Sequence, residues 1–127
     1  MASELRVNTL KDAAGNNSVA MTYVANGSAK AYANFSATAI VKSLNYSSFA
    51  DNGVGDHTLT VTSALSDINY TYGGFARPTT STAFDRGATP DGEDPTTTQQ
   101  RYHSCQLWTA NLEDQEANFT IIHGDLA

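Results

Sequence analysis

The sequence predicts an all-β fold, an antiparallel β-sandwich or jelly-roll-like domain of about seven strands. Apolar and polar residues alternate with a period of two along much of the chain, whereas helical periodicity is nearly absent. Turn-forming residues recur about every 8 to 15 residues, a spacing that suits a sandwich better than a parallel sheet. The 127 residues are enough for one domain with one core.

The composition predicts a thin core and therefore a homo-oligomer. Leu, Ile, Val and Phe supply 23 residues, about 18% of the chain, below the roughly 20% at which disorder has to be considered. Six Tyr, one Trp and a formal net charge of only −6 favour a folded chain. Ser, Thr and Asn supply 37 residues, which suits sheet faces and tight turns. Because subunit contacts bury surface that a thin core cannot, we expect an obligate homo-oligomer.

Charge and hydropathy exclude two classes of partner. The isoelectric point is near 4.7, and seven scattered Lys and Arg residues form no basic stripe, so no nucleic-acid partner is expected. No apolar run approaches the roughly 20 residues of a membrane span, and residues 1–6 lack the apolar stretch of a signal peptide. We therefore expect neither membrane insertion nor export by the Sec pathway.

Residues 1–28 are predicted to form an extended anchoring segment ahead of a sandwich domain of residues 29–127. The alternation over residues 3–10 ends in a turn at residues 11–17. This segment is polar and poorly able to bury itself, so its apolar side chains are expected to anchor the protein to a neighbouring one. The anchoring candidates are Leu5, Val7 and Leu10.

The clearest hairpin is predicted over residues 46–64. Residues 51–56 supply glycines and other turn formers between two alternating arms. The return arm predicts that Leu59 and Val61 are buried on one face and that Thr60 lies on the other. Further strands are expected at residues 30–35, 39–49, 68–72, 101–110 and 117–123, with Phe119 and Ile121 pointing to the same side of the last one.

A long loop is predicted over residues 77–100, because all three prolines lie there and Phe84 is its one bulky apolar residue. Asp91, Glu93 and Asp94 could bind Ca²⁺ through their carboxylates, but a solvated loop is the stronger expectation.

No catalytic, cofactor-binding or metal-binding residue is predicted. His57, His103 and His123 lack the spacing of a zinc site, and Cys105 is the only cysteine, so no disulfide can form within the chain. The sequence contains neither a nucleophile elbow nor a glycine-rich phosphate loop. We expect a protein that is not an enzyme and has no cofactor.

Aromatic and polar side chains predict contacts to a ligand or receptor. Aromatic faces stack on sugar rings, and polar groups bond their hydroxyls. The candidates are Tyr102, Trp108, Asp91, Glu93 and Asp94. The stronger expectation for Trp108 is packing in the core or at a subunit contact.

Several segments carry a resemblance to a known group of proteins. They are residues 3–10 (SELRVNTL), 12–17 (DAAGNN), 46–59 (YSSFADNGVGDHTL), 64–70 (ALSDINY) and 117–125 (ANFTIIHGD). The chain resembles small virion proteins of marine tailed bacteriophages, often labelled tail-fibre or appendage proteins. It is also similar to H-type lectin-like sandwiches, which are trimeric.

The resemblance implies a homotrimeric virion structural protein, made in the host cytoplasm. Such a protein belongs to the tail fibre or a tail appendage and contributes to host attachment. The implied partners are other copies of the chain, other virion proteins and a host-surface glycan. Two alternatives stay open: a capsid decoration or cement protein, and a free sugar-binding lectin-like module.

Overall fold

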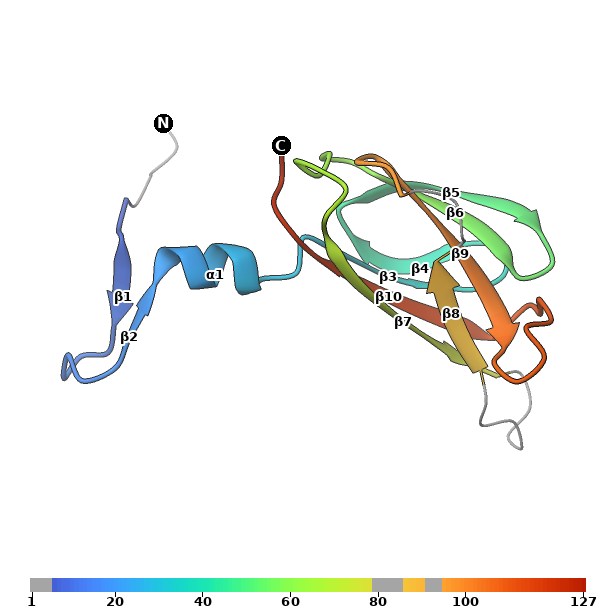
Figure 1. Ribbon diagram of the computed structural model, residues 1–127, viewed down its shortest axis with the longest axis horizontal. Coiled ribbons are helices and arrows are strands. Elements are labelled where there is room, and N and C mark those ends of the chain that lie inside the picture. Colours follow the sequence, from blue (N-terminus) through green and yellow to red (C-terminus); the bar gives the residue numbers. More distant parts are fainter. Residues whose placement is uncertain (1–5, 79–85, 91–94) are drawn as a thin grey trace.

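The computed structural model describes residues 6–78, 86–90 and 95–127. In these residues an N-terminal arm precedes a two-layer antiparallel β-sandwich (Figure 1), so the predicted fold class is confirmed. The arm contains β1 (Thr9–Lys11), β2 (Ser18–Ala20) and α1 (Met21–Gly27). The sandwich contains β3 (Ala31–Phe35), β4 (Ile40–Leu44), β5 (Tyr46–Gly53), β6 (Asp56–Val61), β7 (Thr71–Arg77), β8 (Arg86–Pro90), β9 (Gln99–Gln106) and β10 (Ala117–His123).

The sandwich consists of two four-stranded sheets. We call them the β10 sheet, in the order β4-β3-β10-β7, and the β6 sheet, in the order β5-β6-β9-β8. The chain changes sheet between β4 and β5 at Asn45, whose φ of 60° is in the left-handed region that Asn tolerates better than most residues. The Asn45 side chain fixes this crossing, because its carbonyl accepts a hydrogen bond from the Ser63 backbone N–H at 2.7 Å.

The core lies between the two sheets and is partly polar. Its fully buried apolar side chains include Phe35, Leu59 and Ile122. Leu59 and Val61 are buried as the alternation predicts. In β6 the alternation predicts correctly which side chains are buried, because only one face of this strand packs on the core.

Several segments differ from the sequence-based expectation. Residues 39–49, expected as one strand, belong to two strands in different sheets, β4 and β5. The strand expected at residues 68–72 begins only at Thr71 and continues to Arg77. The sandwich has eight strands in the described residues, because β8 lies within residues 77–100, where a loop was expected. By contrast, the strand predicted at residues 117–123 agrees with β10, which has the same bounds. The strand predicted at residues 101–110 ends at Gln106. In the segment predicted as extended, Met21–Gly27 form a helix.

Candidate interaction surfaces

The N-terminal arm, defined as residues 6–28, has no core of its own. None of its residues is buried, and β1 and β2 pair only with each other, through three residue pairs. Figure 1 shows the arm extending away from the sandwich. A two-stranded hairpin is marginal in water without something to pack on. Nothing in the described residues covers the hairpin, so its surface is available for contact.

Helix α1 supports the same conclusion. It is seven residues long, its N-cap Ala20 makes no side-chain cap hydrogen bond, and none of its residues is buried. Isolated helices shorter than about 12 residues are marginal even in favourable sequences. Met21 and Val24 are three positions apart and therefore lie on one face, so this face can pack on a partner.

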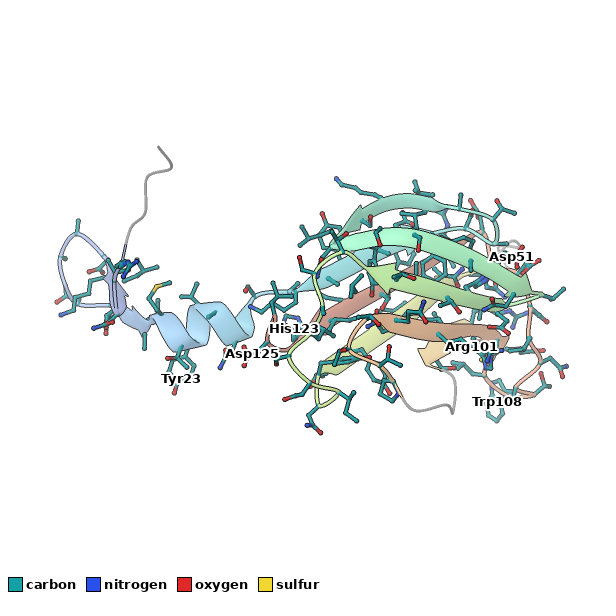
Figure 2. All side chains as sticks on the ribbon, turned by 90° about the horizontal axis from the view of Figure 1, so that it is seen from above. Tyr23, Asp51, Arg101, Trp108, His123 and Asp125 are labelled. Carbon is teal, nitrogen blue, oxygen red and sulfur yellow. The ribbon has the colours of Figure 1, made fainter. Side chains whose placement is uncertain are left out.

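The predicted anchoring side chains are exposed on the arm. Val7 and Leu10 are among its exposed large hydrophobic residues, and Leu5 lies outside the described residues. Leu10 lies opposite Val19 in the register of the hairpin, so these two side chains share one face. Figure 2 shows Tyr23 on α1, well away from the sandwich.

The outer side of the β10 sheet carries a second apolar surface, which we call the apolar outer face. Its apolar side chains, which are between 36% and 72% exposed, are Tyr32, Leu44, Phe75, Phe119 and Ile121. They form two neighbouring rows across the strands, because Tyr32 pairs with both Leu44 and Ile121, and Phe119 pairs with Phe75. A contiguous exposed apolar patch of this kind is a candidate interaction surface.

The apolar outer face exists because the pattern of β10 is inverted. Asn118 and Thr120 point into the interior and are buried, whereas Phe119 and Ile121 point outward. The buried polar groups are satisfied across the sandwich: Ser104 donates to Asn118 at 2.6 Å, and Thr120 donates to the Tyr102 hydroxyl at 2.6 Å. Because β10 keeps these polar residues inside, Phe119 and Ile121 remain exposed on the outer face.

The predicted ligand contacts are not brought together. Tyr102 is only 1% exposed, and burial raises the pKa of its hydroxyl, so the structure does not support a surface contact through this side chain. Trp108 follows the end of β9 and is 86% exposed. The stronger expectation for Trp108 was packing in the core or at a subunit contact. In the single chain it does not pack in the core, and the subunit contact stays a prediction. Asp91, Glu93 and Asp94 lie outside the described residues.

A polar cleft of about 290 Å³ lies where the arm meets the sandwich. Asn26 reaches it from α1, and His123 and Asp125, labelled in Figure 2, line it from the C-terminal end. On its other side the Asp67 carboxylate accepts a hydrogen bond from the Asn69 backbone N–H at 2.7 Å. The part of the chain that the structure describes contains no group of three or more His, Cys, Asp or Glu residues able to hold a metal ion. The cleft can offer hydrogen bonds to a polar ligand.

The turn end of the β6 sheet carries an ion pair. The Arg101 guanidinium donates to both carboxylate oxygens of Asp56, at 2.8 and 2.6 Å. These hydrogen bonds, the largest cause, lower the pKa of Asp56 to about 2. The carboxylate stays charged at neutral pH and ties β6 to β9, so it is not a proton donor at that pH.

No protein family, curated protein or solved structure matches this chain. No helix in the described residues is both long and apolar enough to span a membrane.

Sequence reasoning placed Phe119 and Ile121 on one side of a strand but did not identify that side as the exposed one. The available signal was the neighbouring pair Asn118 and Thr120, which alternates with them. Alternation fixes which residues share a face but not which face is inside. The inward direction of β10 depends on polar partners in β9, which lies in the other sheet, 14 and 18 residues earlier in the chain.

Proposed function

We propose that the protein is a non-enzymatic virion structural protein of a tailed phage, a homotrimeric component of the tail fibre or tail appendage that contributes to host attachment. The virion context comes from the sequence resemblance. The structural support consists of two features that are typical of an assembly subunit. The sandwich has an apolar outer face, and the arm has no part of its own chain to pack on.

The inversion of β10 is the observation that carries the assembly role. Phe119 and Ile121 occupy a strand with a neighbour on both sides, so they lie inside the outer face and not at an edge. Leaving apolar surface exposed instead of buried costs about 25 cal/mol of free energy per Å². A subunit that spends most of its time assembled recovers that free energy at an interface.

Capsid decoration uses the same kind of surfaces and is the second candidate. Trp108, almost fully exposed beyond β9, favours a ligand-binding or attachment role in addition to assembly, because exposed aromatic rings stack on sugar rings. The tail position is proposed from the resemblance.

The test is the location and copy number of this chain in purified particles of the phage that encodes it. We expect immunogold labelling at the tail and a few to a few dozen copies by quantitative mass spectrometry. Hundreds of copies with labelling over the head would mean capsid decoration, and absence from particles would overturn the virion role. A glycan array of the purified chain tests the lectin alternative, with Trp108→Ala as the matched variant.

A further inference from the structure

We infer that the arm of one copy docks on the apolar outer face of a neighbouring copy, so that three chains close a ring by exchanging arms. This inference rests on the proposed assembly role and identifies the partner as a second copy of this chain. In this arrangement the two unpartnered surfaces, the arm and the apolar outer face, cover each other.

The exit point of the arm connects it to the β10 sheet. The Lys30 backbone N–H donates to the Ile122 carbonyl at 2.8 Å, so the arm leaves from the end of the sheet that carries the apolar outer face. The Lys30 ammonium donates to the Ala25 carbonyl and, at 3.0 Å, to the Ser28 hydroxyl. Figure 1 shows α1 extending away from its own sandwich, so the arm is available to a neighbouring copy.

The area of the face favours an arm over a second identical face. A stable interface uses about 800 Å² and 20–30 residues on each partner. One row of the face spans β4, β3 and β10 and the other spans β10 and β7, five side chains in all. With strands about 4.8 Å apart, the face covers on the order of 200 Å². Contact between two such faces therefore buries less than half of what a stable pair needs. In a ring of exchanged arms each chain buries its arm on one neighbour and its face under the arm of the other, so each chain buries such an area twice, whereas a face-to-face pair buries it once.

Charge favours the same docking. The chain has a formal net charge of −6, which makes two copies repel each other. Strands β3, β4, β7 and β10, which are all described, contain no Asp or Glu and carry Lys42 and Arg77. In the arm the one carboxylate is Asp12, which accepts hydrogen bonds from the Asn16 backbone and the Asn17 side chain in its own turn. The arm also carries Arg6 and Lys11, so residues 6–28 have a formal net charge of +1. Residues 29–127 hold five Lys and Arg against eleven Asp and Glu, a net −6, and Arg77 of the face already pairs with Glu116 at 2.7 Å. An arm therefore meets a neighbouring sandwich without the overall repulsion that two sandwiches have.

The symmetry of this contact explains how the chains can close into a ring. An arm meeting a face is a head-to-tail interface between two different patches, and such interfaces close into a ring when the rotation permits. Each chain then uses its arm on one neighbour and its face on the other.

The test measures the mass of the full chain and of variants by native mass spectrometry and sedimentation. We expect wild type at three times the chain mass. The arm variant Leu10→Asp/Val24→Asp and the face variant Phe75→Asp should both fall threefold to the monomer mass with unchanged far-UV circular dichroism, since all three side chains are exposed. The matched control Val54→Asp alters a side chain that is 62% exposed in the β5–β6 turn, outside the face, and should stay trimeric.

Mixing separates arm exchange from other assemblies. The arm variant retains an intact face and the face variant retains an intact arm, so an equimolar mixture should form a 1:1 dimer although each variant alone is a monomer. A wild type that is monomeric at tens of micromolar, or arm variants that remain trimeric, would overturn the inference. A monomeric wild type would also overturn the homotrimer of the proposed function, whereas arm variants that remain trimeric overturn arm exchange alone. Neither result bears on whether the chain is found in virions.

Crosslinking identifies the contact directly. A variant in which the photoreactive residue p-benzoylphenylalanine replaces Tyr23 is mixed with ¹⁵N-labelled wild-type protein and irradiated. We expect crosslinks to labelled peptides that contain β7 or β10. Crosslinks only to peptides of its own chain would show that the arm packs back on its own sandwich.

Discussion

Ser104 and Asn118 are joined across the interior of the sandwich by a hydrogen bond of 2.6 Å, from the serine hydroxyl to the side-chain carbonyl of the asparagine. They belong to β9 and β10 in different sheets, and both are fully buried. Ser104→Ala removes the donor and leaves the Asn118 carbonyl oxygen without it. We expect the free energy of unfolding to fall by about 1–3 kcal/mol.

Urea denaturation followed by circular dichroism measures this change, with Ser48→Ala on the exposed side of β5 as the control. The control should change the free energy of unfolding by less than about 0.5 kcal/mol. Equal effects of the two substitutions would mean that the interior hydrogen bond makes no net contribution.

Gly74 lies where β7 of one sheet packs closely against β8 of the other. A Cβ atom at this position would overlap the backbone carbonyl of Ala88 in β8, whereas a Cβ at Gly73 would lie in ordinary contact, 3.7 Å from Cγ2 of Ile121. Gly74→Ala should therefore lower the free energy of unfolding by about 1–3 kcal/mol or more, as overpacking does. Gly73→Ala should leave it unchanged or raise it slightly, because alanine reduces the freedom of the unfolded chain. Thermal unfolding of both variants checks the difference; two equally stable variants would contradict it.

The sequence predicted the sandwich best where each strand buries one face. Leu59 and Val61 alternate with threonines, and both are buried. β8 was missed because its five residues include a glycine and a proline and no bulky apolar side chain; it is a strand because it pairs with β9. Such pairing is a tertiary property that local propensity does not contain.

The interaction surfaces were less predictable, for a different reason. Leu10 was chosen as an anchoring residue because an extended polar segment cannot bury it, and the structure leaves it exposed. Tyr102 was chosen because aromatic residues contact ligands, but it lies inside the core, bonded to Thr120. Whether an aromatic residue in a strand faces a ligand or the core depends on which side the second sheet covers.

His57 provides a prediction about pH. Its ring is fully buried between Phe49, at a centroid distance of 5.5 Å, and Phe35, at 5.6 Å, and neither ring nitrogen has a hydrogen-bond partner among the described residues. Burial, the largest cause, lowers the pKa of His57 below its ordinary value of 6.5. The unfolded chain therefore binds this proton more readily than the folded chain, so the free energy of unfolding should fall as the pH drops below about 6.5.

The variant His57→Phe isolates this contribution, because the ring is retained and the proton site is removed. We expect its free energy of unfolding, relative to wild type, to be higher at about pH 5 than at about pH 7.5. Urea titrations at both pH values measure this, with His123→Asn as the control for a histidine that is only partly buried. An identical pH dependence of His57→Phe and wild type would show that His57 does not account for the acid sensitivity.

Val61 and Thr60 give the sharpest test of the register of β6. Val61 is 6% exposed and packs in the core, whereas Thr60 points to the other face, where its hydroxyl accepts a hydrogen bond from the Gln99 side chain at 3.4 Å. Val61→Asp places an unpaired charge in the core at a penalty of several kcal/mol, comparable with the whole stability of a domain of about 5–15 kcal/mol. We expect this variant to be unfolded by circular dichroism and to fail to assemble. Thr60→Asp should remain folded and keep the oligomeric mass of wild type, because the proposed arm contact lies on the other sheet. If both variants fold, the register of β6 is wrong; if Thr60→Asp folds but stays monomeric, the interface runs across the β6 sheet instead.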